Sequence, residues 1–369
     1  MRSRIIFCLM LLAPMAHSVI EPETVGRTEL KKPTPSWFIV KSSSGPAYLY
    51  DGADGEMLGL LSLTDWTPAV EPNVRRGEIY AAETYYSRGI RGERTDVVTV
   101  YDLKTLTPVA EIKVPNKIAA LVPFRHYIGL LDDARHLAVF NLTPAQSVTI
   151  VDVRDRQFVG EISTPGCALI MPSPDRSFLM MCGDGSLQLI RLDRRGAEVA
   201  RVRSDVFFSV EKDPIFDRPV KTDGGWSLVS FDGNVFDVSV EDDTINVSES
   251  WSILDKDKEE MAGWRIGGSQ VMTLHRGTGL LYTLMHKGKK DTHDDAGTEI
   301  WVYDKQAKRR IGRIELKDPV RMLYVSQEDK PTLIVGTQAG KIQMFEGRAL
   351  KLIRTIDQPG AYPGLLQGF

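Results

Sequence analysis

A single β-hairpin pattern recurs seven times along the 369 residues of this chain, and this repeat constrains the fold more than any other feature. In each copy, alternating apolar residues lead to an acidic residue, a polar turn and a second apolar run, as in VVTVYDLKTLTPVAEIKV at 97–114. An aspartate suits the start of a turn because its carboxylate accepts hydrogen bonds from backbone N–H groups two residues on. The acidic position falls at Asp51, Asp102, Asp152, Asp193, Asp237, Asp304 and Glu346.

The spacing of these hairpins selects among all-β architectures. Successive acidic positions lie about 40 to 50 residues apart, the length of a four-stranded propeller blade, with one longer step between Asp237 and Asp304. Each hairpin supplies two strands, and apolar segments such as 117–142 and 319–338 supply two more. The sequence therefore predicts an all-β fold, a seven-bladed β-propeller of four-stranded antiparallel blades whose closure leaves only short edges. A pair of ordinary β-sandwiches is the alternative.

The N-terminus predicts export. Arg2 and Arg4 precede an apolar run over 5–15, and Ala16-His17-Ser18 matches a small-x-small cleavage pattern. An uncleaved anchor is the alternative, but the run is shorter than the ~20 residues that span a bilayer. We expect a signal peptide at 1–18, an N-terminal extension at 19–36, a propeller at 37–369 and a periplasmic location without a membrane partner.

Cysteine use fits an oxidising compartment. Cys8 lies in the signal peptide, so the mature chain keeps Cys167 and Cys182, which flank two apolar runs around the turn at 172–176. Antiparallel neighbours joined by this turn can bring the two sulfur atoms to bonding distance, and closing such a loop adds about 3 kcal/mol on the chain-entropy model. We expect a disulfide; two buried free thiols are the alternative.

Charge and motifs exclude several classes of function. A net charge of -3 without long basic stripes argues against a nucleic-acid partner. His275, His286 and His293 are too widely spaced for a helical metal site, so no metal is expected. No Gly-x-Ser-x-Gly elbow is present, and no catalytic residue is expected in this chain.

Two insertions interrupt the repeat. The segment SRGIRGERTD at 87–96 holds two glycines and three arginines, and LDKDKEEMAGW at 254–264 predicts a short polar helix after Asp255. Insertions in a propeller lie at the faces of the disc, where ligands and partners bind.

Three segments resemble the heavy subunit of the quinoprotein amine dehydrogenases, the methylamine and aromatic amine enzymes. They are YYSRGIRGERTDVVTVYDLKTLTPVAEIKVP at 85–115, the GWRIGG.Q....HR run at 263–276, and DGSLQ after Cys182. The resemblance extends from about Trp37 to Leu352. It implies a seven-bladed heavy chain with paired cysteines and no cofactor of its own. A small disulfide-rich light subunit would hold tryptophan tryptophylquinone and convert primary amines to aldehyde and ammonia.

The resemblance also implies partners and site residues. Electrons would pass to a blue-copper protein or a cytochrome c, and we expect a heterotetramer of two heavy and two light chains. Tyr86 would help close the substrate channel, while Ser269 and Asp294 depart from the family pattern. Residues expected at the light-subunit interface are Arg88, Arg91, Arg94, Trp264 and Arg265.

Two other functions stay open on the sequence. The same propeller would serve as an exported scaffold or ligand-binding module with no quinone partner. A self-sufficient hydrolase of the propeller lactonase type would instead place Glu, Asp, Asn or His side chains at the central channel.

Overall fold

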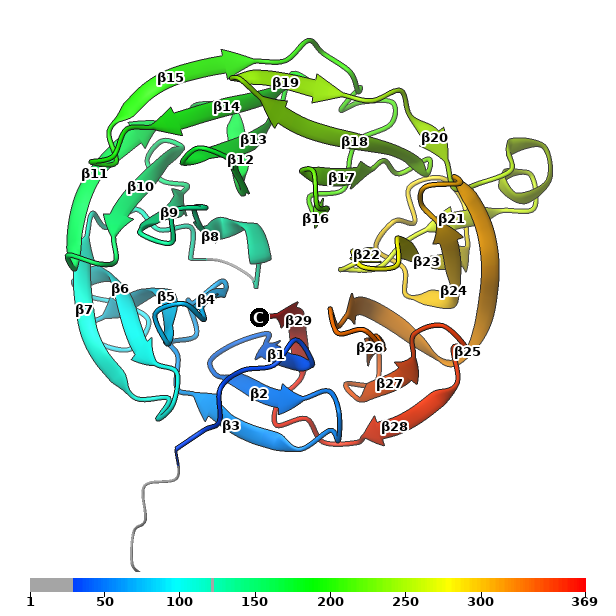
Figure 1. The fold of residues 1–369 in the computed structure, drawn as a ribbon, viewed down its shortest axis with the longest axis horizontal. Coiled ribbons are helices and arrows are strands. Elements are labelled where there is room, and N and C mark those ends of the chain that lie inside the picture. The colour runs from blue at the N-terminus through cyan, green and yellow to red at the C-terminus, as the bar shows by residue number, and fades with distance from the viewer. Residues whose placement is uncertain (1–28, 121–122) are drawn as a thin grey trace, which may run out of the picture.

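Sheets arranged around a central axis form a ring in the computed structural model (Figure 1), which describes residues 29–120 and 123–369. The predicted all-β propeller is confirmed, whereas a pair of sandwiches is not what the chain forms. The predicted signal peptide at 1–18 lies outside the described residues, as do residues 19–28 of the predicted extension.

Four sheets have four strands each, in order from the innermost strand outward. The first consists of β29 (Pro363–Gly368), β1 (Trp37–Ser42), β2 (Ala47–Asp51) and β3 (Met57–Leu61). The second consists of β4 (Val70–Asn73), β5 (Glu78–Tyr86), β6 (Arg94–Asp102) and β7 (Pro108–Val114). The third consists of β8 (Ile128–Leu130), β9 (His136–Asn141), β10 (Ser147–Asp152) and β11 (Gln157–Ser163). The fourth consists of β12 (Cys167–Ser173), β13 (Ser177–Cys182), β14 (Leu187–Leu192) and β15 (Glu198–Arg203).

Two sheets are larger. The five-stranded sheet consists of β16 (Val220–Lys221), β17 (Trp226–Val229), β18 (Asn234–Glu241), β19 (Thr244–Val247) and β20 (Trp251–Ser252). The eight-stranded sheet consists of β21 (Trp264–Ile266), β22 (Met272–His275), β23 (Leu280–Lys287), β24 (Gly297–Asp304), β25 (Arg309–Val325), β26 (Thr332–Thr337), β27 (Ile342–Glu346) and β28 (Leu352–Ile356). The short helical turns are η1 (Arg125–Tyr127) and η2 (Lys256–Glu260).

The hydrogen bonding does not divide the chain into the seven separate four-stranded sheets that the sequence predicts. Among the described residues it gives five sheets of blade size and one of eight strands. The cause is β25, which runs for 17 residues, pairing first with β24 and then, from Val320 to Val325, with β26. Because β25 is continuous, the strands that end with β24 and the strands that begin with β26 form one sheet. A break within β25 would have separated them into two sheets.

The ring is closed by strands from opposite ends of the chain. β29 pairs antiparallel with β1, placing Phe38 opposite Gly368 and Ile39 opposite Gln367. This pairing covers the edge that β1 would otherwise expose, which is how propellers avoid open edges.

The hairpin turns follow the predicted aspartates with one exception. Asp102 ends β6, and its carboxylate accepts bonds from the N–H groups of Lys104 and Thr105 at 3.0 and 2.8 Å. The prediction for Asp237 is wrong, because this residue lies inside β18. Its carboxylate instead accepts bonds from the Ser227 hydroxyl and the Lys305 ammonium, and the turn follows four residues later.

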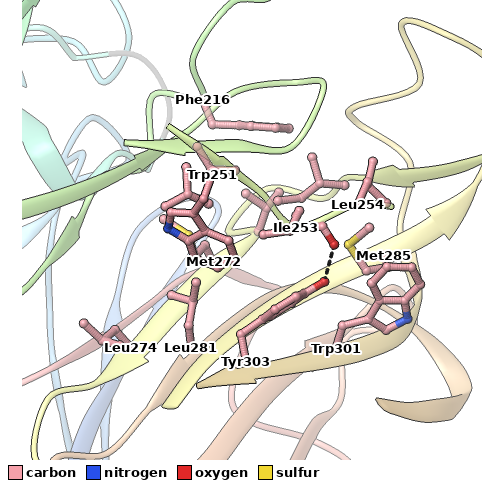
Figure 2. Close-up of a cluster of buried hydrophobic side chains, with 14 of the residues drawn as sticks. Phe216, Trp251, Ile253, Leu254, Met272, Leu274, Leu281, Met285, Trp301 and Tyr303 are labelled. Carbon is pink, nitrogen blue, oxygen red and sulfur yellow. Dashed lines mark hydrogen bonds between the residues drawn. The ribbon is translucent and has the colours of Figure 1, made fainter. Parts of the chain in front are cut away.

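Apolar side chains fill the spaces between neighbouring sheets. In the cluster of Figure 2, Trp301 is fully buried, and the Tyr303 hydroxyl donates a 2.7 Å bond to the Ile253 carbonyl. The short helix expected within 254–264 is the single turn η2. No helix in the described part of the chain combines the length and the apolar character needed to cross a membrane.

The expected disulfide is confirmed. Cys167 and Cys182 lie opposite each other in the β12–β13 pair, with a Cα–Cα distance of 4.0 Å and an S–S bond of 2.04 Å.

Candidate functional site

The loop 87–93, which joins β5 to β6, presents the residues that the sequence analysis singled out first. Tyr86 ends β5 and is half-buried, with its ring 6.0 Å from that of Trp66 in an edge-to-face arrangement. The loop is held by a 2.9 Å bond from the Arg88 N–H to the Arg91 carbonyl. At Gly92, with φ +104°, a Cβ would lie 2.3 Å from the Ser87 hydroxyl, so this tight turn requires glycine.

Arg94 anchors the far side of this loop. It lies opposite Tyr86 in the β5–β6 register and binds the buried Asp96 carboxylate through two bonds of 2.8 and 2.7 Å. The bond to Asp96 raises the pKa of Arg94, and the same guanidinium donates to the Ile118 carbonyl. Arg94 therefore positions the loop, and its charge is largely committed to this chain.

Arg88 and Arg91 behave differently from Arg94. Both are exposed, as is the apolar Ile90 between them at 67%. Unlike Arg94, these three side chains are therefore open to solvent.

The second group of predicted residues lies at β21. Trp264 is 8% exposed, packs 5.1 Å from the Trp301 ring, and has Lys287 5.3 Å from its ring centroid. Arg265 donates a 2.7 Å bond to the Trp264 carbonyl. Trp264 thus belongs chiefly to the core, whereas Arg265 reaches a surface hollow of about 230 Å³ that Phe231 also lines.

These two groups share one face of the disc. A propeller repeats one strand order in every blade, so the loops between second and third strands reach the same face. Loop 87–93 and loop 288–296 are such loops, and β21 pairs with the end of β23 that enters 288–296. We call this the Tyr86 face.

The structure does not bring the two groups together. Figure 1 shows β5 and β6 on one side of the central axis and β21, β23 and β24 on the other. A partner that touches both groups must therefore lie across the end of the central channel.

The two departures from the family pattern lie in different settings. The Ser269 hydroxyl donates a 3.0 Å bond to the Arg321 carbonyl, so this side chain supports a strand. Asp294 is exposed on loop 288–296, at 86% of its side chain, and is available on the Tyr86 face.

Sequence reasoning missed the polar residues at the ring axis, which come from the innermost strands and the segments beside them. They share no local motif, so only closure of the ring identifies them. They are Glu71, Arg125, Arg218, Lys221, Arg276 and Tyr324.

The described residues contain no group of three or more His, Cys, Asp or Glu side chains that could hold a metal ion. Within this same part of the chain, Trp264 and Trp301 form a close tryptophan pair, but Trp301 is fully buried and inaccessible to a substrate. This pair therefore does not fit a quinone cofactor that must meet an amine.

Comparison with known proteins agrees with these features. The family model of the methylamine dehydrogenase heavy chain matches residues 33–368. The methylamine dehydrogenase heavy chain of Methylophilus methylotrophus is 30% identical over 320 residues, covering 85% of this chain and 78% of that protein. Its counterpart in Methylobacillus flagellatus is 28% identical, covering 84% and 78%.

A solved structure supports the fold alone. A functionally unknown protein from Desulfotomaculum acetoxidans superposes with a TM-score of 0.61 at 10% identity, covering 90% of this chain and 98% of that one. Because the family model matches nearly all described residues, the chain belongs to the methylamine dehydrogenase heavy chain family.

Proposed function

We propose that this chain is the heavy subunit of a periplasmic amine dehydrogenase that oxidatively deaminates primary amines to aldehyde and ammonia. The observation that carries the proposal is the family match over 33–368. The Tyr86 face of this chain, with the exposed Arg88 and Arg91, would dock a light subunit that holds tryptophan tryptophylquinone. Electrons would then pass to a blue-copper protein or a cytochrome c.

The cofactor belongs to the light subunit in this proposal, because the Trp264–Trp301 pair of this chain is closed to solvent. The quinone would supply an electrophilic carbonyl that takes up the amine. This chain would contribute a rigid wall: Tyr86 and Trp66 would narrow the channel and keep bulk water from the reacting carbon.

We also infer that the ring has seven blades. Pairing of β25 with β24 along its first half and with β26 along its second half supports counting the eight-stranded sheet as two blades. A rigid closed disc suits a subunit whose role is to hold a partner.

Co-expression of this chain with a cysteine-rich light-chain gene tests the function. The expected result is a complex of two heavy and two light chains with quinone absorbance, which reduces a redox dye when a primary amine is added. Separation of the chains should abolish the activity. A light chain that is active alone, or a heavy chain that never associates, would contradict the proposal.

A further inference from the structure

A cavity of about 290 Å³ lies at the axis of the ring. Its walls come from the innermost strands, including β4, β16, β22, β25 and β29, and from the segments beside them. The volume is at the lower end of the range for small-molecule sites, so any ligand must be small.

Among the charged side chains of this wall, Arg125, Arg218, Lys221 and Arg276 are cationic and Glu71 is anionic. Arg125 is paired with Glu71 at 2.7 Å, and Arg218 with Asp217 at 2.7 Å. Arg218 also donates a 2.9 Å bond to the Ser269 carbonyl. These two guanidinium groups therefore have their charges balanced within the chain.

Lys221 and Arg276, in contrast, have no ion-pair partner among the described residues. In residues 29–120 and 123–369, no ion pair or side-chain hydrogen bond engages either cationic group, and the Lys221 ammonium lies 5.7 Å from the Trp226 ring centroid. Desolvation lowers the pKa of Lys221, and the nearby charges of Arg276 and Arg125 lower it further against the attraction of Glu71. Both side chains remain exposed to the channel, where water and ions reach them.

Tyr324 adds a neutral donor to the same wall. Burial raises the pKa of Tyr324 to about 12, so the phenol keeps its proton at physiological pH. Its hydroxyl has no hydrogen-bond partner among the described residues and lies against Gly368, where a Cβ would be 1.7 Å away. An ammonium, a guanidinium and a phenol, all donors, thus line one small cavity.

We propose that this axial cavity binds a small oxyanion, a carboxylate or a phosphate-type group, held by Lys221 and Arg276. Clefts lined by one sign of charge concentrate counter-ions, and charge-assisted bonds to oxyanions are the strong ones. Glu71 attracts Lys221 through its charge, but its ion pair in the described residues is with Arg125 and not with Lys221 or Arg276.

Calorimetric titration of the purified full chain tests the proposal. Sodium phosphate and sodium citrate serve as probes, with sodium chloride at matched ionic strength as the blank, and the two arms distinguish an inorganic from an organic oxyanion. The expected result is one saturable site. Lys221→Gln and Arg276→Gln should each weaken binding about tenfold or more, because each removes a charge-assisted bond.

Matched controls are Lys104→Gln and Arg194→Gln, which remove exposed cations outside the cavity and should leave binding unchanged. The proposal would be overturned if both probes gave the same heats of injection as the chloride blank. It would also be overturned if the wild type, the two cavity variants and the two controls all bound the probes with equal affinity. A second measurement avoids the variants: in crystals soaked in selenate, an anomalous peak inside the cavity supports the site, and peaks only elsewhere reject it.

Discussion

Asp96 is a fully buried carboxylate whose charge is balanced by Arg94. We expect Arg94→Ala to lower the free energy of unfolding by about 3 kcal/mol, because removing one partner of a buried pair leaves an uncompensated charge. Bonds from the Thr84 hydroxyl and the Ile118 N–H to Asp96 would limit the loss. Urea unfolding measures it.

Arg91→Ala is the matched control, since Arg91 is exposed in the same loop and should change stability by less than about 0.5 kcal/mol. Equal effects of the two substitutions would show that the Arg94–Asp96 pair does not stabilise this loop.

Tyr86 is the residue expected to influence which primary amine the enzyme prefers. In the assembled enzyme, Tyr86→Ala should shift the ratio of kcat/KM for longer over shorter primary amines by about tenfold. The reason is that one substrate methylene in an apolar pocket changes kcat/KM by about tenfold or more. The control is Tyr85→Ala, because successive strand residues point to opposite faces. An unchanged profile for Tyr86→Ala would remove this residue from the channel.

His126 gives the chain a predictable response to acid. It is 7% exposed, with Nε2 3.1 Å from the Pro219 carbonyl oxygen. Burial, and then the charges of Arg125 and Arg218, lower the pKa of His126 to about 3. An unfolded histidine has a pKa of about 6.5, so below that pH the unfolded chain binds more protons than the folded chain.

The stability associated with neutral His126 is therefore complete above about pH 6.5 and is lost as pH falls toward 3. Between pH 6.5 and 5 we expect a loss of about 2 kcal/mol, measured by urea unfolding at each pH. His126→Gln should remove this part of the slope, whereas Gln338→Ala, at an exposed side chain that does not titrate, should not. Parallel slopes in all three proteins would contradict the assignment.

Secondary-structure elements were the most predictable level of this molecule. Alternation of apolar residues and a turn-forming aspartate are both local, so the hairpin at Asp102 could be predicted from a dozen residues. Asp237 misled the prediction because its carboxylate is engaged by Lys305, which belongs to another sheet. A local pattern contains no information about such a partner.

The disulfide acts on the β12–β13 element. Replacing both cysteines, Cys167→Ala with Cys182→Ala, should cost about 3 kcal/mol, because the bridge closes a loop with a sequence separation of 15. Chemical reduction of the wild type should produce a similar loss in urea unfolding. Reduction should have no effect on the double variant, and an equal effect there would show that the loss has another cause.

At the scale of the whole molecule, Gln270 connects strands that are far apart in the sequence. Its side chain donates a 2.9 Å bond to the Leu366 carbonyl and accepts a 2.7 Å bond from the Leu366 N–H. Its backbone carbonyl accepts a 3.1 Å bond from the Leu323 N–H. Gln270 thus connects the segment just before β22 to β25 and to β29.

Gln270→Ala should lower the free energy of unfolding by about 2 kcal/mol, because it leaves both backbone groups of Leu366 without their partner. Amide hydrogen exchange at Leu366 should quicken in the variant. Gln338→Ala removes an exposed glutamine and serves as the control. Unchanged exchange at Leu366 would show that β29 is held by its pairing with β1 alone.

The sequence by itself determined the repeat, the hairpins and the pairing of Cys167 with Cys182, because each depends on residues close together along the chain. The sequence motifs also identified the family, but they did not show where the residues of those motifs lie in the fold. Only the tertiary structure decided that β5 and β21 lie across the axis from each other, and that Lys221 and Arg276 share a cavity. The physical reason is closure: pairs such as Phe38 and Gly368 meet only when the ring forms.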